Sequence, residues 1–463
     1  MATEKKENKG LDISTRSVVI AVAVILALMI ITYVLTLVIP GGAFRYSEAG
    51  EIIGDSFTYI DGGIPFWKWL LSPILVLGAD GSATLIAVII FLLVIGGVFN
   101  SLGEADIMSY MLNKIVHRFF DNKYKLLTIV SVFFMAMGTL VGSFEECIPL
   151  VPIVVGVAVG LGWDPQLGLG MSLLAVSCGF ATAMTNPFTV GVAQSLAGLP
   201  MFSGIWLRAV AFVIIGSALL LFLHSYARKV ENKDLKLNEN DFAADPKKDK
   251  ALLCFGLILG AGILLVLSST FITALQDYTM IIVALMFLIA GIVATLAAGN
   301  SASFLGKTFL KGVLTIAPSI VLILMAASIK YTMVEAKILD TILHSAVNIA
   351  SGMPKFAVIL FIYLITLVMN FFISSGSAKA ILLIPLLVPM ASLFGISSQL
   401  VILAYVFGDG FSNVFYPTNP VTLIGCSVAG INYGQWVKFS WKFQIPNLII
   451  TSLILVFGLA IGY

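Results

Sequence analysis

A polar pentapeptide occurs twice in this chain, each time inside a long apolar stretch. Thr-Asn-Pro-Phe-Thr at 185–189 returns as Thr-Asn-Pro-Val-Thr at 418–422, an offset of 233 residues. The same offset relates four further pairs: Ile148 and Ile381, Pro152 and Pro385, Gly162 and Gly395, Gln166 and Gln399. The chain therefore looks like two copies of one unit. A polar break in corresponding apolar helices of two halves indicates a membrane transporter's binding site.

The composition places the chain in a membrane. Of its 463 residues, 59% are hydrophobic and 11% are charged, and the mean hydropathy is +1.06. These values exclude a water-soluble core, and several apolar runs of about 20 residues reach the length of a spanning helix. We expect no nucleic-acid partner. We also expect neither disulfides nor zinc sites, because the four cysteines lie in apolar segments without CxxC spacing: Cys147, Cys178, Cys254 and Cys426.

Charge and hydropathy predict the topology of the N-terminal part. The first span, Val18 to Ile39, is too long for a signal peptide and is expected to be retained. The lysine-rich tail 1–16 should be cytoplasmic and the acidic loop 41–81 should lie outside. A second span follows at 82–102. The basic segment 228–250 is expected to be a cytoplasmic linker between the two repeats.

A re-entrant hairpin and a broken helix are expected in the first repeat, 17–227. The apolar content after residue 123 is too long for two plain helices, yet an even number of crossings is required. A hairpin at 123–162, a broken helix at 166–199 and a last span at 206–227 satisfy both conditions. Non-helical backbone at this depth must be buried in protein or line a wet cavity.

The second half, 251–463, should repeat this order. We expect two linker spans, then a span, a hairpin, a broken helix and a last span: 251–272, 277–299, 314–335, 354–395, 398–430 and 441–463. Nine crossings place the C-terminus outside and make the copies run in opposite directions. One feature fits this topology poorly, because three lysines would lie on the outer side: Lys330, Lys337 and Lys355. The predicted fold class is an all-α polytopic membrane protein with inverted-topology repeats, re-entrant hairpins and broken helices.

Two segments, 105–120 and 337–352, lie between a span and a hairpin in each copy. In the first, apolar residues recur at helical spacing: Met108, Met111, Leu112, Ile115 and Phe119. Such amphipathic helices lie in the membrane interface plane. The alternative is a connector without a mechanical role.

The pentapeptides carry groups suited to ligand binding. A helix broken at mid-membrane exposes N–H groups that attract anions and carbonyls that coordinate cations. Asn186 and Asn419 each offer a donor and an acceptor. Pro187 and Pro420 suit a first helical position. We expect 185–189 and 418–422 to be non-helical and to bind substrate, with hydroxyls from Thr185, Thr189, Thr418 and Thr422. The alternative is a kink whose polar residues only satisfy the freed backbone.

The two hairpin tips differ between the copies. Tip one contains Gly142, Ser143, Glu145 and Glu146, and tip two contains Ser375, Gly376, Ser377 and Lys379. Ionisable side chains at membrane depth are costly and usually functional. The carboxylates could recognise an amino group, a proton or a metal ion, and the lysine a carboxylate. The alternative is a Glu–Lys pair that joins the copies, since Glu146 corresponds to Lys379. Asp409 and Asn413 are further candidates.

Four segments resemble the bacterial C4-dicarboxylate anaerobic carrier family, more closely its YfcC-like branch, within the ion transporter superfamily. They are GSFEE (142–146), TNPFTVGVAQSLAG (185–198), SSGSAKA (374–380) and FGDGFSNVFYPTNP (407–420). Related branches are similar to arginine/ornithine exchangers and aminobenzoyl-glutamate-type carriers. The resemblance covers the chain from about residue 82 onward.

The resemblance implies one substrate site surrounded by hairpins and broken helices. It also implies a homodimer in which a transport domain moves against a scaffold, the elevator mechanism. Family members with sodium sites place them between a hairpin tip and a helix break, which here pairs Ser143 with Asn186 and Ser377 with Asn419. This chain has Thr-Asn-Pro where the sodium/dicarboxylate branch has Ser-Asn-Thr.

The leading hypothesis is a secondary transporter for a small carboxylate-bearing metabolite, either an amino acid or a C4-dicarboxylate, in a bacterial-type inner membrane. We expect no enzymatic activity and no cofactor, but sodium or proton coupling, or exchange. A basic amino acid exchanger is the nearest alternative. A passive channel and a non-transporting receptor or scaffold are alternatives of other classes.

Overall fold

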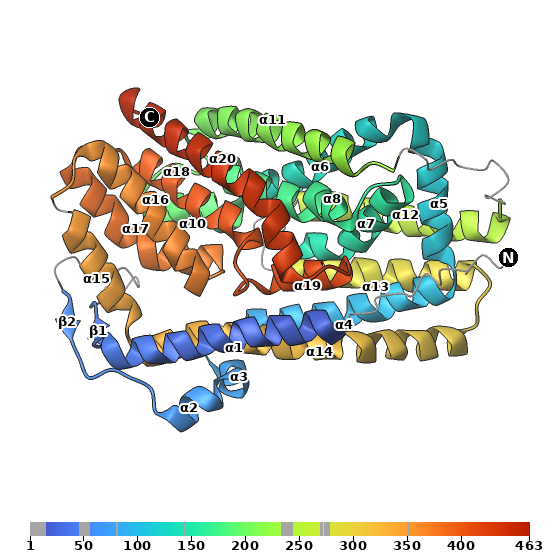
Figure 1. Cartoon of the computed structure of the whole chain (residues 1–463), viewed down its shortest axis with the longest axis horizontal. Helices are drawn as coiled ribbons and strands as arrows, with labels where there is room; N and C mark the ends of the chain where they lie inside the picture. The colour runs from blue at the N-terminus through green and yellow to red at the C-terminus, as the bar shows by residue number, and fades with distance from the viewer. Residues whose placement is uncertain are drawn as a thin grey trace.

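The computed structural model describes residues 15–45, 56–79, 82–142, 144–232, 244–268, 272, 278–350 and 352–463. Within these ranges helices dominate, and the strands are one antiparallel pair, β1 (Gly42–Ala43) and β2 (Thr58–Tyr59). Figure 1 shows the long helices running along one axis of the molecule. The prediction of an all-α polytopic membrane protein is confirmed.

The helices before the linker are α1 (Thr15–Val38), α2 (Phe66–Leu70), α3 (Ser72–Leu75), α4 (Ser82–Glu104), α5 (Ile107–Phe119), α6 (Lys123–Leu140), α7 (Val151–Gly160), α8 (Pro165–Leu169), α9 (Ala175–Thr182), α10 (Val192–Leu196) and α11 (Ile205–Val230). Short 3-10 turns are η1 (Val76–Gly78), η2 (Phe120–Asn122) and η3 (Glu145–Leu150). Two π-helical turns interrupt the broken helix, η4 (Gly170–Leu174) and η5 (Pro187–Gly191).

The helices after the linker are α12 (Pro246–Ser268), α13 (Thr279–Ala297), α14 (Ala302–Glu335), α15 (Leu339–Ala350), α16 (Lys355–Phe372), α17 (Gly376–Leu393), α18 (Ser398–Gly410), α19 (Pro420–Val428) and α20 (Tyr433–Ala460), with a 3-10 turn η8 (Phe411–Val414) after α18.

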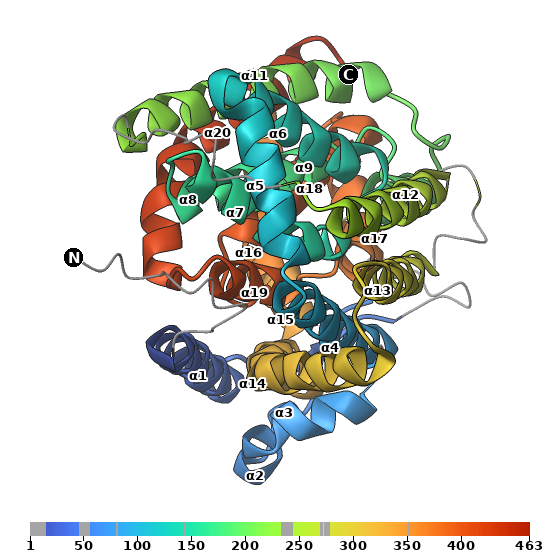
Figure 2. The same cartoon turned by 90° about the vertical axis from the view of Figure 1, so that its right-hand side faces the viewer.

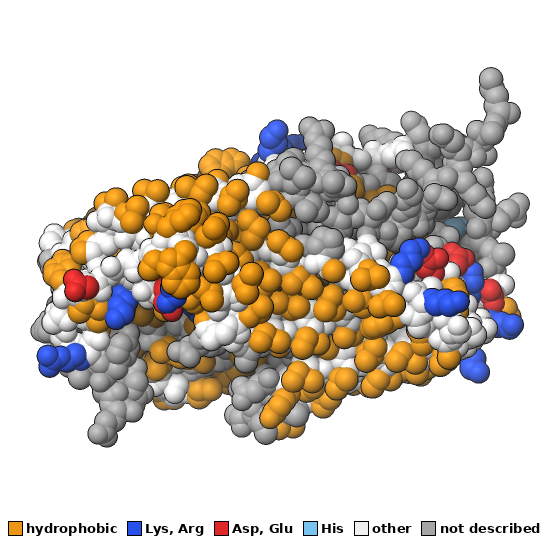
Figure 3. All heavy atoms as spheres, turned by 90° about the horizontal axis from the view of Figure 1, so that it is seen from below, with side chains coloured by type: hydrophobic (Ala, Val, Ile, Leu, Met, Phe, Trp, Pro, Cys, Tyr) orange, Lys and Arg blue, Asp and Glu red, His pale blue; other side chains and the backbone are white. Residues whose placement is uncertain are grey.

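Seven stretches within the described ranges are long and apolar enough to cross a membrane, and three shorter apolar helices accompany them. Large apolar side chains on α1 and α14 face outward, among them Leu37 and Leu314, with 66% and 65% of their surface exposed. Figure 3 shows the resulting apolar band between two ends that carry charged side chains. A water-soluble protein would not expose so much contiguous apolar surface, so this band faces lipid.

The two halves run in opposite directions. Helices α5 and α15 correspond at the offset of 233, and they lie at opposite ends of the long axis (Figure 1). The hairpin helices α7 and α17 also occupy opposite halves of that axis. The hydroxyl of Ser177 donates to the carbonyl of Gly410, its counterpart at the same offset, over 2.7 Å. Equivalent residues that touch must lie near the pseudo-two-fold axis, so this axis passes between α9 and α18.

Helices α9 and α18 form the centre of the core. Every residue of α9 is buried, as is the run from Leu400 to Gly410 in α18. Two glycines allow close packing here. A β-carbon at Gly410 would lie 2.2 Å from the α-carbon of Ala181, and one at Gly179 would lie 1.9 Å from the carbonyl oxygen of Met135. The interrupted helices are therefore held rigidly at the centre of the molecule.

The molecule has two layers (Figure 2). Helices α1, α4 and α14 pack together on one side, with α13 against α4, while the hairpins and broken helices form a thicker block on the other side. Helix α19 is among the elements of the block that contact the first layer, through α1 and α14.

The loops predicted to share a side of the membrane do meet. Lys114 pairs with Asp249, and Lys248 pairs with Asp106, each over 2.5 Å, which joins the end of α4 and helix α5 to the start of α12. The Lys114 ammonium and the Tyr110 hydroxyl hold the pKa of Asp249 below its usual range. At the other end, Lys68 pairs with Glu335. Glu335 is the last residue of α14, so this pair adds another lysine near those that fitted the sequence topology poorly.

The helix breaks begin and end earlier than expected. Helix α9 ends at Thr182, Ala183 adopts a left-handed φ of 41°, and a new helical turn begins at Pro187. In the second half the helix resumes at Pro420. The expectation that 185–189 and 418–422 are wholly non-helical was therefore wrong for their last three residues. The reason is that each asparagine caps a helix whose first residue is the proline.

Candidate substrate site

The asparagine of each break is committed to capping through its amide oxygen. Asn186 Oδ1 accepts from the backbone N–H groups of Phe188 and Thr189, at 2.9 and 3.3 Å. Asn419 Oδ1 accepts from the N–H of Val421 at 3.0 Å. What each asparagine can still offer a ligand is therefore its Nδ2 group, a donor.

The backbone of the first break is held open by the end of α6. Thr139 accepts the Met184 N–H through its hydroxyl at 3.0 Å and the Thr185 N–H through its carbonyl at 3.1 Å. The Thr185 hydroxyl donates to the carbonyl of Leu140 at 2.9 Å. Because these bonds replace the lost helical ones, the break needs no ligand to stay open. Thr185 thus serves the backbone.

Two polar atoms at the start of the next helix lack a partner. Asn186 Nδ2 and Thr189 Oγ1 are fully buried and have no hydrogen-bond partner among the described residues. They lie at the N-terminal end of the ten-residue helical run 187–196, formed by η5 and α10, where backbone N–H groups and the helix dipole favour an anion. Hairpin tip one covers this corner, since a β-carbon at Gly142 would lie 2.3 Å from Asn186 Oδ1.

The second break uses the same residue types internally. Asn419 Nδ2 donates to Asn413 Oδ1 at 3.2 Å, and the Thr422 hydroxyl donates to the Asn413 carbonyl at 2.7 Å. Asn413 Oδ1 also accepts from Asn370 at 3.0 Å. Thr418 Oγ1 is buried and has no partner among the described residues. Most of the polar groups of the second pentapeptide are therefore satisfied by the protein itself.

Lys379 is completely buried beside this second network. Its ammonium donates to Asp409 Oδ1 at 2.5 Å, to the carbonyl of Ile373 at 3.1 Å, and to Asn370 Oδ1. The ion-pair partner of Lys379 is thus Asp409, a residue of the same repeat, and the alternative pairing with Glu146 falls on a side chain outside the described residues. Only one carboxylate oxygen is used: Asp409 Oδ2 has no hydrogen-bond partner among the described residues.

Hairpin tip two meets the first break. The Ser377 hydroxyl donates to the carbonyl of Phe188 at 2.8 Å. A β-carbon at Gly376 would lie 2.7 Å from Thr189 Cγ2 and 2.9 Å from Asp409 Oδ2. The resemblance implies a pairing of Ser377 with Asn419, whereas the hydrogen bond of Ser377 is made to the first pentapeptide, because α17 of one repeat packs on α10 of the other. Gly376 therefore lies between Thr189 and Asp409, and any side chain at this position would contact both.

The remaining predicted residues are less central. Ser375 is exposed and accepts from the Ala378 N–H as the N-cap of α17. Glu145 is half-buried at tip one. Ser143 lies outside the described residues, as does the side chain of Glu146. The described residues contain no group of three or more His, Cys, Asp or Glu side chains that could hold a metal ion.

Two residues at the centre were not predicted from the sequence. Asn370 links Lys379 to Asn413, and its signal was a lone amide in the apolar run before tip two. Arg208 is fully buried near the start of α11, and its Nη2 donates to the carbonyls of Met184 and Phe202 at 3.4 and 3.0 Å. Its signal was a single arginine inside an apolar span.

Sequence comparison finds matches over most of the chain. The sequence profile described as "C4-dicarboxylate anaerobic carrier" matches residues 19–460. An Escherichia coli (strain K12) protein, provisionally described as the basic amino acid antiporter YfcC, is 30% identical over 404 residues, which are 82% of this chain and 79% of that protein. An uncharacterized Haemophilus influenzae protein (strain ATCC 51907 / DSM 11121 / KW20 / Rd) is 25% identical over 397 residues, 81% of this chain and 76% of its own length.

Two solved transporter structures align with most of the chain. The Alcanivorax borkumensis YdaH transporter covers 96% of this chain and 99% of its own, at 19% identity and a TM-score of 0.47. Neisseria gonorrhoeae MtrF covers 94% of each chain, at 17% identity and a TM-score of 0.46. With the profile match across nearly its whole length, the chain belongs to the C4-dicarboxylate anaerobic carrier family of membrane transporters.

Proposed function

We propose that this protein is a secondary active transporter that moves a small carboxylate-bearing metabolite across a bacterial-type inner membrane, with its N-terminus in the cytoplasm. One observation carries the proposal. Asn186 Nδ2, Thr189 Oγ1 and Asp409 Oδ2 are buried polar atoms without partners among the described residues. Asn186 lies beside Gly142 of tip one, and Thr189 and Asp409 both lie beside Gly376 of tip two. Leaving such atoms unpaired costs free energy, about 1–3 kcal/mol each, which a ligand would return on binding.

The substrate carboxylate belongs at the first break. Asn186 Nδ2 is a donor, and the Thr189 hydroxyl can donate as well, so both can bind carboxylate oxygens. They are placed at a helix N-terminus, which adds a favourable dipole. A sodium ion fits poorly at Asn186, because the only oxygen of its side chain already accepts two backbone hydrogen bonds. The predicted sodium sites at Ser143 with Asn186 and at Ser377 with Asn419 are therefore not part of this proposal.

The other end of the substrate decides between an amino acid and a C4-dicarboxylate. Asp409 Oδ2 is the free acceptor next to Gly376, and a substrate ammonium would pair with it. A second substrate carboxylate fits poorly there, because Lys379 donates to Oδ1 and no donor lies between Asp409 Oδ2 and the incoming oxygens. The geometry therefore favours an amino acid. The provisional description of the Escherichia coli relative as a basic amino acid antiporter supports the same choice.

Transport requires a second conformation, because the proposed site is closed. Asn186, Thr189, Lys379 and Asp409 have 0% exposed surface. We propose that the block of hairpins and broken helices moves against the layer of α1, α4 and α14, as in an elevator, within a homodimer. A passive channel would need a continuous wet path past these residues, and their burial argues against one.

Ligand-induced stabilisation of the purified protein tests the substrate class. L-arginine, L-ornithine and L-alanine should raise the melting temperature, whereas succinate and fumarate should not. Asn186→Ala should abolish the shift. Asn432→Ala is the matched control. Asn432 is the N-cap of α20 and accepts the backbone N–H of Gln435, so this variant also loses a capping hydrogen bond. Succinate as the sole stabilising ligand would reassign the substrate to the dicarboxylates. Non-saturable flux in liposomes, with no ligand shift, would contradict the transporter proposal.

A further inference from the structure

We propose that the Lys379 ammonium is a built-in cation that occupies a sodium-type oxygen cage in the second repeat, so that this repeat binds no sodium unless the lysine is removed. The consequence for the coupling ion rests on the proposed transport function. The claim about ion binding does not, because it involves neither Asn186 nor Thr189.

The atoms around Lys379 are those that hold a hard cation. Its three partners are a carboxylate oxygen of Asp409, an amide oxygen of Asn370 and a backbone carbonyl, that of Ile373. Ile373 is the C-cap of α16, so its carbonyl lies at the negative end of a helix dipole. Unwound carbonyls at half-helix ends coordinate sodium in transporters with broken helices. Here an ammonium takes the place of the ion.

The side chain of Lys379 reaches this cage from the first turn of α17. Its backbone N–H is bonded to the carbonyl of Ser375, so the residue is fixed just after the hairpin tip. From there the ammonium extends back to Ile373 at the end of α16 and across to Asp409 in α18. One lysine therefore joins both arms of the hairpin to the broken helix, which a bound ion would otherwise have to do.

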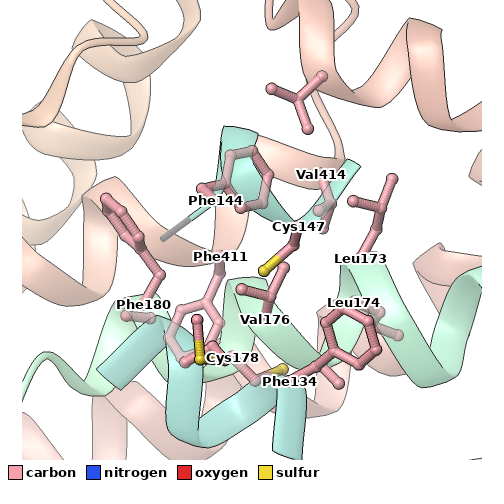
Figure 4. Close-up of a cluster of buried hydrophobic side chains, with 14 of the residues drawn as sticks. Phe134, Phe144, Cys147, Leu173, Leu174, Val176, Cys178, Phe180, Phe411 and Val414 are labelled. Carbon is pink, nitrogen blue, oxygen red and sulfur yellow. The ribbon is translucent and has the colours of Figure 1, made fainter. Parts of the chain in front are cut away.

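The cage exists in one repeat only. At the offset of 233, Asn370, Asp409 and Asn413 correspond to Met137, Val176 and Phe180, all three apolar and buried. Figure 4 shows Val176 and Phe180 among packed hydrophobic side chains. The carbonyl of Leu140, the counterpart of Ile373, accepts the Thr185 hydroxyl instead.

The buried carboxylate requires a cation at this place. Asp409 has no exposed surface. Without a positive charge the buried carboxylate would be strongly destabilised. A bound sodium ion supplies such a charge only while it is bound, whereas Lys379 supplies it permanently. In this proposal sodium does not couple to transport through the second repeat.

The experiment compares melting temperatures of wild type, Lys379→Ala and Lys379→Met in NaCl and in choline chloride at equal ionic strength, without substrate. Alanine leaves room for an ion and water in the cage, whereas methionine fills the space with an apolar chain. We expect wild type to melt at the same temperature in both salts. Lys379→Ala should melt at a lower temperature than wild type in choline chloride, and sodium should raise its melting temperature saturably, by about 2–4 °C. The melting temperature of Lys379→Met should not change with sodium.

Two results would overturn the proposal: a saturable sodium shift in wild type, or an alanine variant that melts identically in both salts. A folded alanine variant obtained only in NaCl would support it. If neither variant folds, the wild-type titration decides, since a sodium shift contradicts a pre-occupied cage and its absence supports one. Because no substrate is present, failure here is distinguishable from failure of the proposed amino-acid site.

Discussion

The two repeats contain the same Thr-Asn-Pro-x-Thr sequence and use it differently. In the first repeat Asn186 Nδ2 and Thr189 Oγ1 have no partner in the described part of the chain. In the second, Asn419 Nδ2 and the Thr422 hydroxyl both bind Asn413. The first pentapeptide is therefore available to a ligand, whereas most of the second is committed to holding its own backbone. The shared sequence therefore gives both repeats a helix break, but the hydrogen-bond partners of its side chains differ between them.

The surroundings of the breaks differ in the same way. The first break is backed by an apolar cluster that includes Phe144, Val176 and Phe180 (Figure 4), which stabilises by burial. The second is backed by the Lys379–Asp409 pair and the amides of Asn370 and Asn413. Only the first repeat contains π-helical turns among the described residues, η4 and η5. Such turns often accompany functional sites.

Breaking the ion pair should have the largest effect. Lys379→Met or Asp409→Val alone should destabilise the protein by about 3–5 kcal/mol, because each leaves a buried charge without its partner. The double variant removes both charges and should recover part of this loss. Unfolding in denaturant, followed as a double-mutant cycle, measures the coupling. Additive losses in the double variant would show that the two charges do not interact.

Adding a methyl group at either hairpin tip should have the next largest effect, and the effect should differ between the two tips. Gly142→Ala places a β-carbon 2.3 Å from Asn186 Oδ1 at a φ of 77°, and Gly376→Ala places one 2.7 Å from Thr189 Cγ2. We expect Gly142→Ala to lower the free energy of unfolding by about 2–3 kcal/mol, from overpacking and backbone strain, and Gly376→Ala to lower it by about 1–2 kcal/mol. Both should weaken substrate binding. Equal stability losses would remove the distinction between the tips.

Removing the capping asparagines should give smaller and unequal effects. Asn419→Ala loses a cap and the bond to Asn413, which should lower the free energy of unfolding by about 2 kcal/mol. Asn186→Ala loses the cap alone, which should lower it by about 1 kcal/mol. Substrate affinity should change in the opposite order, with a loss of about tenfold or more for Asn186→Ala. Chemical unfolding and ligand titration of the two variants check both rankings. Equal affinity losses would make the second break part of the substrate site.

The helical membrane fold could be predicted because its signals are local: apolar runs, the prolines of the two breaks and the shared offset all lie along the chain. The bounds of the repeats and hairpins stay a prediction. The contacts could not be placed. An offset identifies equivalent residues, but only those beside the pseudo-two-fold axis touch their counterparts, as Ser177 and Gly410 do. The actual neighbours, Ser377 with Phe188 and Lys379 with Asp409, depend on how α17 packs between α10 and α18.

The division between a recognition break and a structural break is tested most directly by one matched pair, Thr189→Val and Thr422→Val. The two residues are equivalent at the offset, and valine replaces only the hydroxyl. Thr189→Val should leave the free energy of unfolding within about 0.5 kcal/mol and weaken substrate binding about tenfold, because its hydroxyl is unpaired in the described structure. Thr422→Val should cost about 1 kcal/mol of stability, through loss of the 2.7 Å bond to Asn413, with affinity unchanged within about twofold. The reverse pattern, or equal losses of affinity, would contradict the account.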